Sequence, residues 1–541
     1  MFYWYGNCIF ECMKKIYLSS LIFFVILFGY SQKEFHVFPE SHSMTPGKPS
    51  GNGSMNQPWD LQTALNQSSD SVNGDDIIWL HEGVYNGRYY SKLNSTISNK
   101  YITVSSFLNE WAVLNGNIIS NQTAVLTVTG SGVIYKNFEI TWLGEFSRNS
   151  KDASFQKSDG VSHLNGKDCK FLNLMIHNNP GSGFGSWKRT SNAIIENCII
   201  YNNGFMTSRR GSGVGMYVQN ESDEERLIKN NVIFNNYYKG IEVWSASTHS
   251  KVAIVKNVTL DNNVIFNSGL ISGSFKDNLI IATDDVLGIN IAKNITVSNN
   301  IFYHNTTLSK AIENSDAPSL TLGFNEKSPI ENITINNNII IGRKDALRVL
   351  SAKSLTFKNN MVYSGYARFF KPVLKHINNK SWEFEKNTYY TRNSKPIRIQ
   401  GEIDYSIQQW QAIYGLGRLS QWKYFKEFDA DQVPKITKIN TQENTYRVVL
   451  FNKELEDVMV DFYEYNLPEN SNYIIKDVEN YKHILDSGTL AETSKIKIPM
   501  NVTRDKMKSY NNFGVYDIEF KKNETIETKD FLERFLNWLG I

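Results

Sequence analysis

The sequence predicts an all-β fold, a right-handed parallel β-helix, and two observations carry this expectation. A short apolar phrase flanked by asparagines recurs along the chain, beginning for example at Asn197, Asn230 and Asn262, 33 and 32 residues apart. The chain also has 541 residues, more than one ordinary core of about 100–200 residues accommodates. A solenoid avoids that limit because each coil packs only on its neighbours. A β-sandwich with evenly spaced strands is the alternative, but it does not require the same phrase to return.

Each phrase has the chemistry of one strand of a β-helix coil. Its centre is β-branched or aromatic, as in Ile199-Ile200-Tyr201, and is apolar enough to be buried. The asparagines at its ends tolerate the left-handed backbone of a sharp turn between sheets. Stacked on successive coils, their side chains can hydrogen-bond in a ladder. Further copies begin at Asn299, Asn337 and Asn359, and degenerate copies begin at Lys136, Leu172 and Lys386.

The predicted solenoid begins with a cap. Asp60 can cap a short helix over residues 61–67, which would cover the edge of the first coil. The following stretch Gly74-Asp-Asp-Ile-Ile-Trp-Leu-His-Glu-Gly-Val-Tyr85 resembles the opening coil of pectin-lyase-like β-helix proteins, including chondroitinase-B-like and alginate lyases. The resemblance spans roughly residues 50–395. It implies the fold and a polysaccharide partner but not one reaction, because this superfold carries lyases, hydrolases, esterases and non-catalytic proteins.

The chain divides into five predicted segments. Residues 1–32 read as a signal peptide, 33–395 as the β-helix, 396–433 as a connector, 434–525 as a small antiparallel β-sandwich and 526–541 as an amphipathic helix. The sandwich follows from five short alternating strands that appear after the asparagine phrases stop. Its expected role is packing, with ligand binding as the alternative.

The first segment predicts secretion to the periplasm, the cell surface or the medium. Lys14 and Lys15 precede an apolar run over residues 16–28, followed by small residues suited to cleavage. Met13 is an alternative start, and an uncleaved anchor is the alternative function of the run. No membrane span is expected in the mature chain.

The cysteines and the charge balance exclude several classes of site. Cys8 and Cys12 fall in the signal segment, which leaves Cys169 and Cys198 about 13 Å apart along adjacent coils, too far for a disulfide. We expect two buried thiols and no zinc site. Lys plus Arg is 57 and Asp plus Glu is 54, without a basic block, so nucleic acid is not an expected partner. The oligomeric state does not follow from the sequence.

A second column of strands predicts a functional face. We align these strands on the inward residues Val161, Phe184, Val214, Ile241, Leu279 and Leu347, so that their neighbours point outward. Trp187, Tyr217 and Trp244 would then form an aromatic ribbon beside a floor made by Gly185 and Gly215. Such a ribbon suits the CH faces of a sugar chain. The alternative is a small satellite core covered by loops.

The predicted site combines this ribbon with charged residues. The candidate catalytic residues are Lys239, Glu242, Arg210 and Asp159, and the candidate substrate-binding residues are Trp187, Tyr217, Trp244, Arg209 and Lys188. A lyase needs a cation for the uronate carboxylate and a base, with Asp159 or Glu242 able to hold Ca²⁺. A hydrolase needs two carboxyls about 5–9.5 Å apart, and Asp159 and Glu242 would be too distant. Glu242 with Asp277, or with the loop pair Asp284 and Asp285, is the remaining option.

The sequence favours a polysaccharide lyase slightly over a glycoside hydrolase. Two histidines are weak candidates, because His163 should point inward and His177 should lie near a turn. Paired acids such as Asp284 and Asp285 are more often solvated charges. Chains that this one resembles can carry histidines in the strand matching residues 211–217, where this chain has Ser212 and Val214. A non-catalytic glycan-binding β-helix is therefore the third hypothesis.

Overall fold

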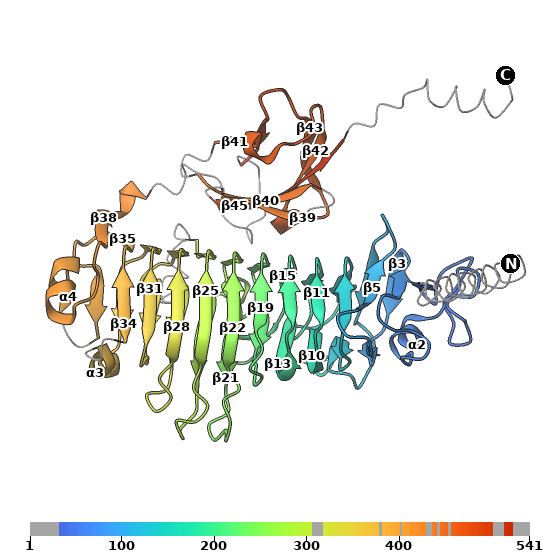
Figure 1. Ribbon diagram of the computed structural model, residues 1–541, viewed down its shortest axis with the longest axis horizontal. Coiled ribbons are helices and arrows are strands. Elements are labelled where there is room, and N and C mark those ends of the chain that lie inside the picture. The colour runs from blue at the N-terminus through green and yellow to red at the C-terminus, as the bar shows by residue number, and fades with distance from the viewer. Residues whose placement is uncertain are drawn as a thin grey trace, which may run out of the picture.

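The computed structural model describes residues 32–305, 318–377, 381–400, 403–428, 435–440, 444–452, 456–500 and 513–522. Its main body is an elongated solenoid of three long sheets, with a smaller β module lying along one side (Figure 1). Each coil contributes one strand to each sheet, in the order sheet 1, sheet 2, sheet 3. Neighbouring strands are parallel, as in Ile194↔Leu227 and Ile199↔Val232, apart from the terminal strand of sheet 3. The prediction of an all-β parallel β-helix is confirmed.

Each of the three sheets has twelve strands. Sheet 1 contains β1 (Glu34–Val37), β2 (Ile77–Leu80), β5 (Ile102–Ser106), β8 (Val133–Lys136), β11 (Lys170–Leu172), β14 (Ile194–Glu196), β19 (Arg226–Lys229), β22 (Lys256–Asp261), β25 (Lys293–Ser298), β28 (Glu331–Asn336), β31 (Leu355–Lys358) and β34 (Trp382–Glu385). Sheet 2 contains β3 (Gly83–Asn86), β6 (Ala112–Asn115), β9 (Glu139–Thr141), β12 (Met175–His177), β15 (Ile199–Tyr201), β20 (Val232–Phe234), β23 (Val264–Phe266), β26 (Ile301–Tyr303), β29 (Ile339–Ile341), β32 (Met361–Tyr363), β35 (Thr388–Thr391) and β38 (Gln421–Tyr424). Sheet 3 contains β4 (Tyr89–Ser91), β7 (Ala124–Val128), β10 (Asp159–Lys167), β13 (Phe184–Ser191), β18 (Met216–Val218), β21 (Ile241–Ser245), β24 (Leu279–Thr283), β27 (Leu320–Leu322), β30 (Leu347–Val349), β33 (Ala367–Phe369), β36 (Ile397–Ile399) and β37 (Asp404–Tyr405).

The short elements lie at the ends and in the loops of the solenoid. The sheets continue past residue 395, because β36 and β38 extend them into the predicted connector. Asp60 caps α2 by accepting from Thr63 N at 2.9 Å, and Ser406 caps α4. The short elements are α2 (Leu61–Leu65), the hairpin β16 (Phe205–Met206) and β17 (Gly211–Ser212), η1 (Leu270–Ser272), η3 (Lys371–Val373), α3 (Leu374–Ile377), α4 (Ile407–Tyr414) and η4 (Phe425–Glu427).

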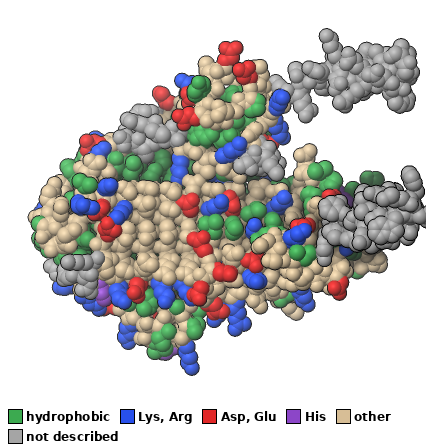
Figure 2. Space-filling view, in the orientation of Figure 1, with side chains coloured by type: hydrophobic (Ala, Val, Ile, Leu, Met, Phe, Trp, Pro, Cys, Tyr) green, Lys and Arg blue, Asp and Glu red, His purple; other side chains and the backbone are tan. Residues whose placement is uncertain are grey.

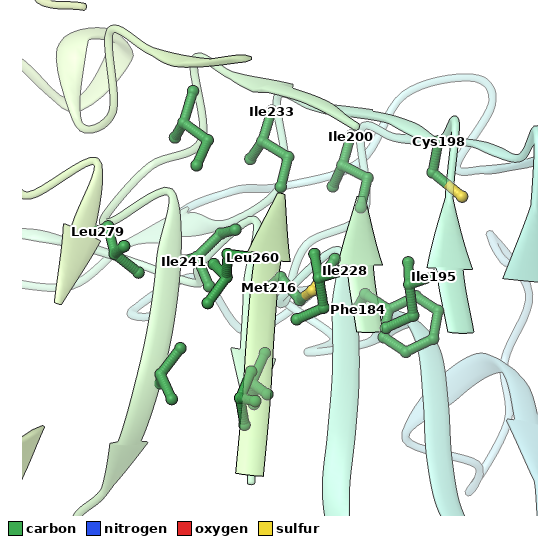
Figure 3. Packing of buried hydrophobic residues seen from close by; sticks show 14 of the residues in the cluster. Phe184, Ile195, Cys198, Ile200, Met216, Ile228, Ile233, Ile241, Leu260 and Leu279 are labelled. Atoms are coloured by element: carbon green, nitrogen blue, oxygen red, sulfur yellow. The ribbon is translucent and has the colours of Figure 1, made fainter. Parts of the chain in front are cut away.

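The interior of the solenoid is filled by columns of apolar side chains. In sheet 3 the inward column runs Val161, Phe184, Met216, Ile241, Leu279, each wholly buried. Figure 3 shows Met216 in line between Phe184 and Ile241. Five of the six predicted inward residues are therefore correct, and Val214 is wrong by two positions. The chain leaves the coil at the β16–β17 hairpin and re-enters it later than the Gly-Val-Gly pattern suggests.

Asparagine ladders hold successive coils together, as the repeated phrase predicts. The first asparagine of a phrase adopts positive φ, as at Asn230 (57°), Asn262 (54°) and Asn299 (60°). The second is wholly buried and donates to its counterpart on the next coil at 2.9–3.2 Å. This ladder consists of Asn231, Asn263, Asn300, Asn338, Asn360 and Asn387. A shorter ladder joins Asn179, Asn203 and Asn236.

We expect Asn300→Leu to lower the free energy of unfolding by at least about 2 kcal/mol, because it leaves buried backbone and amide groups without partners. The Asn300 amide donates to Leu260 O, Ser298 O and Asn338 Oδ1, and its oxygen accepts from Asn263 N. Thr296→Val on β25 is the control, since Thr296 is only partly buried. Urea unfolding of both variants checks the prediction, and equal midpoints would contradict it.

The two cysteines of the solenoid are free and buried, as predicted. Cys198 occupies the ladder position next to Asn231, whose side chain accepts from its backbone N–H. Burial raises the pKa of both thiols to about 12, so neither is a reactive thiolate at neutral pH.

The C-terminal module consists of two antiparallel sheets that share one apolar cluster. The larger sheet orders β39 (Lys435–Asn440), β40 (Thr445–Phe451), β45 (Phe513–Lys521), β42 (Asn472–Asp477) and β43 (Ile484–Thr489), and the smaller pairs β41 (Val458–Asp461) with β44 (Lys495–Ile498). Two short turns, η6 (Tyr463–Tyr465) and η7 (Val478–Asn480), connect its strands.

This module packs on the outer face of sheet 2. Apolar residues of β15, β20, β23 and β26 form one cluster with Val449, Phe451, Phe513 and Val515 of the module. Phe513 stacks on Tyr303 with ring centroids 4.1 Å apart. The module therefore covers the outer face of sheet 2 from β15 to β26. The predicted signal peptide and the C-terminal helix 526–541 lie outside the described residues.

Candidate functional site

The outward column of sheet 3 is the centre of the candidate site. Strand pairing aligns Ser162, Gly185, Tyr217, Glu242, Ile280, Thr321 and Arg348 on successive coils. The column continues with Arg368 and Arg398. Successive side chains are about 4.8 Å apart, the spacing of paired strands. The site therefore has the form of a ribbon along the solenoid.

The aromatic ribbon differs from the prediction. Tyr217 pairs with Gly185 and Glu242, so it does not share a column with Trp187 and Trp244. Its misplacement follows from the error at Val214. Trp187 bends back and donates from Nε1 to Ser162 Oγ at 3.0 Å, and its ring lies 5.3 Å from that of Tyr217. The two side chains form a partly exposed aromatic pair on the same wall.

The predicted glycine floor is also wrong. A Cβ at Gly185 would lie 2.9 Å from Trp187 Nε1, so the indole covers this glycine. Gly215 lies at the corner of the coil, where a Cβ would meet Ile233 and the Asn236 amide at 2.5 and 2.8 Å. Close packing under the asparagine ladder therefore explains Gly215. Trp244, partly exposed two residues after Glu242, contacts Phe324 edge-on at 5.1 Å.

Lys239 and Glu242 form a largely buried ion pair. Lys239 Nζ donates to Glu242 Oε1 at 2.8 Å, and each side chain is 11% exposed. Burial lowers the pKa of Lys239, but the charges of Glu242 and Asp277 outweigh it and raise that pKa overall. Lys239 is therefore an ammonium at neutral pH and serves as a cation, not as a base.

A second acid–base cluster lies on the next coils. Gly240 N donates to Asp277 O at 3.1 Å, which places Asp277 beside Lys239. Asp277 Oδ1 accepts from Arg348 Nη2 at 3.1 Å and from the Thr321 hydroxyl. Arg348 Nε also donates to Thr321 Oγ1 at 3.1 Å. Asp277 thus fixes the guanidinium of Arg348 at the surface of sheet 3.

Lys276 also lies at this cluster, although no pattern in the sequence indicates it. It precedes Asp277 and is half-buried, and no described carboxylate forms an ion pair with it. Burial lowers the pKa of Lys276, and the cations Arg210, Lys239 and Arg348 lower it further against the opposing charge of Asp277. A lysine in such surroundings is easier to deprotonate than an ordinary one, which is what a general base requires.

The structure brings Arg210 to this cluster and leaves other predicted residues outside it. The Arg210 guanidinium lies 4.0 Å from the ring centre of Tyr238, and Lys239 Nζ lies 4.7 Å from the same ring. Asp159 lies three coils from Glu242, about 14 Å at ordinary strand spacing, and accepts from Ser182 N at 2.7 Å. Burial raises the pKa of Asp159. Arg209 is exposed in the hairpin turn, and Lys188 follows Trp187 on β13.

The surroundings of the two candidate histidines and of the two loop acids are those of residues with a structural role. His163 is wholly buried, as predicted, and burial keeps its pKa well below the ordinary value. His177 is buried against Glu139 at 2.8 Å, on sheet 2. Asp285 is not a solvated charge, because it is wholly buried and accepts from Ile289 N at 2.9 Å. Asp284 accepts from the Asn325 amide at 3.3 Å.

The architecture and the family comparison agree. Residues 83–265 match the family model described as "Right handed beta helix region". Three parallel twelve-stranded sheets, turned at left-handed asparagines, extend this architecture on both sides of the match. The protein is a parallel β-helix, and residues 83–265 match the right-handed β-helix family. A comparison with curated protein sequences finds no match.

Several solved structures are similar to the β-helix protein, at low sequence identity and with TM-scores below 0.5. They include pectate lyase Pel9A, at 17% identity and a TM-score of 0.42, covering 69% of this chain and 78% of that chain. A rhamnogalacturonan lyase has 13% identity and a TM-score of 0.43, covering 73% and 88%. Tailspike gp49 of Acinetobacter baumannii bacteriophage Fri1, a capsular polysaccharide depolymerase, has 12% identity and a TM-score of 0.35, covering 91% and 86%. Similarity at this level carries no argument about activity.

The donor set of the β-helix protein does not fit the Ca²⁺ site that a lyase could use. Among the described residues, no three or more His, Cys, Asp or Glu side chains converge as a metal site. Glu242 is bound to Lys239, and Asp159 lies three coils away.

In the described parts of the chain, none of the helices has the length and apolar character needed to cross a bilayer.

Proposed function

We propose that the protein is a secreted polysaccharide lyase that acts on a uronate-containing glycan lying along the outer face of sheet 3. The observation that carries the proposal is a group of cations on this face. Arg210 and Lys239 lie against the ring of Tyr238, and Arg348 binds Asp277, which follows Lys276 in the chain. Burial and these cations lower the pKa of Lys276. Partly exposed Trp187, Tyr217 and Trp244 lie on the same face and offer rings to sugar CH groups. Export directed by residues 1–32 would place the protein with such a substrate.

The proposed reaction is β-elimination. Lys276, as the free amine, takes the proton from the carbon next to the uronate carboxylate. The electron pair of that C–H bond forms a carbon–carbon double bond, while the bond from the neighbouring carbon to the glycosidic oxygen breaks. The leaving oxygen takes a proton from the Lys276 ammonium or from solvent water, and loss of the proton from the ammonium restores the free amine. Arg210, Lys239 and Arg348 stabilise the charge that builds up on the carboxylate in the transition state.

A glycoside hydrolase on the same face is supported less well. Its two carboxyl groups would be Glu242 and Asp277, which lie on adjacent coils. Both are bound to cations, Glu242 to Lys239 and Asp277 to Arg348, so neither is placed to donate a proton to a glycosidic oxygen. In the lyase mechanism Lys239 and Arg348 stabilise the charge on the substrate carboxylate, and we therefore prefer the lyase to the hydrolase.

The proposal is tested by incubating the full-length protein with a panel of uronate-containing and neutral polysaccharides. We expect ultraviolet absorbance from the new double bond together with shorter chains, on uronate-containing glycans alone. New reducing ends without that absorbance would identify a hydrolase and overturn the lyase. Binding without any cleavage would identify a non-catalytic glycan-binding protein.

A further inference from the structure

A cavity lies away from sheet 3, where the C-terminal module meets the corner between sheets 1 and 2. Its volume is about 430 Å³, and its walls include Asn230, Asn262, Asn299 and Asn337, the left-handed turn residues of four successive coils. Lys435 of β39 closes it from the module. Figure 1 shows the module lying over the ends of the sheet 1 strands that lead into these turns. Ligand sites favour such junctions between domains.

The groups in this cavity are polar and are held in place. Asn262 Nδ2 donates to Asn230 Oδ1 at 2.8 Å and to Thr437 Oγ1 of β39 at 3.0 Å, which ties the wall to the module. Asp261 Oδ1 accepts from Ser298 Oγ and from Asn299 Nδ2, both at 2.8 Å. No described residue occupies the second oxygen of Asp261 or the side-chain amide of Asn337. These groups remain available to a ligand with hydroxyls.

Lys435 supplies a positive charge with little compensation. Its Nζ donates to the carbonyl of Asn299, and no described carboxylate lies within ion-pair distance. Burial lowers the pKa of Lys435 to about 8, and the charge of Asp261 opposes this shift. The other lysine of the wall, Lys229, is neutralised by Glu196 at 3.1 Å. An anionic group beside Lys435 would restore the partner that this ammonium lacks.

We propose that this cavity binds a monosaccharide-sized ligand that is rich in hydroxyls and carries one anionic group. Lys435 contacts the anion, while Asp261 and Asn337 hydrogen-bond to the hydroxyls. A uronate and a sugar phosphate share this chemistry. The inference does not depend on the lyase activity proposed for sheet 3, because it rests on different residues and a different face.

Calorimetric titration of the full-length protein tests the proposal with glucuronate, glucose 6-phosphate, glucose and inorganic phosphate. The Lys276→Gln protein serves as the background, so that turnover at sheet 3 does not contribute. We expect glucuronate or glucose 6-phosphate to bind at least tenfold more tightly than glucose and phosphate. Lys435→Met should weaken that binding at least tenfold.

Two further variants separate recognition from folding. Asn337→Gly removes an amide without straining the left-handed backbone and should also weaken binding. Lys438→Met, on the same strand but exposed, should leave binding unchanged. Phosphate binding as tight as that of the anionic sugars, equal binding of glucose, or no loss in the Lys435 and Asn337 variants would overturn the proposal. So would the absence of binding by all four probes.

Discussion

Replacing Lys276 with Gln is expected to lower kcat of uronate-glycan cleavage by about 10²–10⁴-fold, the usual contribution of a general base. The amide cannot accept the proton that the lysine amine accepts. Lys276→Arg should be equally inactive, because a guanidinium keeps the charge but stays protonated. Initial rates from the absorbance of the unsaturated product measure both effects.

The pH dependence distinguishes a base from a residue that only binds. Since the base must be unprotonated, kcat/KM should rise with pH and level off above the pKa of Lys276, which lies below its ordinary value of 10.5. Lys239→Met removes one of the cations that lower this pKa, so the rising limb should move to higher pH. Profiles of the native protein and this variant, measured over the same buffers, make the comparison.

The control is Lys353→Gln, which also removes one lysine charge. Lys353 follows β30 and forms an ion pair with Glu331 of sheet 1. It should leave both kcat and the pH profile unaltered. A Lys276→Gln protein that retains a native melting curve and cleaves at the native rate would remove Lys276 from the mechanism. The elimination would then require a general base other than Lys276 on sheet 3.

The repeats made the solenoid predictable, but its site depended on a register that two residues can change. The asparagine phrases identify the coils because each needs a left-handed turn and a buried amide. At sheet 3, however, Gly183-Phe-Gly185 and Gly213-Val-Gly215 look equivalent in sequence. The structure aligns Gly183 with Gly215, since the β16–β17 hairpin takes up the extra residues. Tyr217 moved with this shift into the column of Glu242.

The charged cluster was only partly predictable for a different reason. Lys239, Glu242 and Arg210 were identified from the strand and its preceding loop. Lys276 has no signal in the sequence, because its lowered pKa arises from burial and from cations on three other segments. The docking of the module on sheet 2 was not predicted either, although outward aromatic residues of the phrases, such as Phe234 and Phe266, form the surface that it covers.

The junction between solenoid and module supplies the second large expected effect. Arg447 of β40 is 4% exposed and binds Asp517 of β45 with both ends of its guanidinium, at 2.7 and 2.9 Å. Its third nitrogen donates to Asn230 O of the solenoid at 2.6 Å. The carboxylate keeps the pKa of Arg447 raised in spite of its burial. The Arg447 side chain thus connects β40 and β45 of the module to the turn at Asn230 of the β-helix.

Arg447→Met is expected to destabilise the protein by about 3–5 kcal/mol, because it leaves Asp517 buried, charged and unpaired. Arg447→Met combined with Asp517→Leu should recover most of this loss, since apolar residues can replace a buried ion pair at little cost. Urea unfolding followed by far-ultraviolet circular dichroism measures all three proteins. If the double variant is as unstable as the single one, the dominant contribution is the hydrogen bond to Asn230 and the packing of the long side chain. The module would then be held by contacts that an apolar substitute cannot reproduce, and the cavity beside Lys435 should lose its shape in both variants.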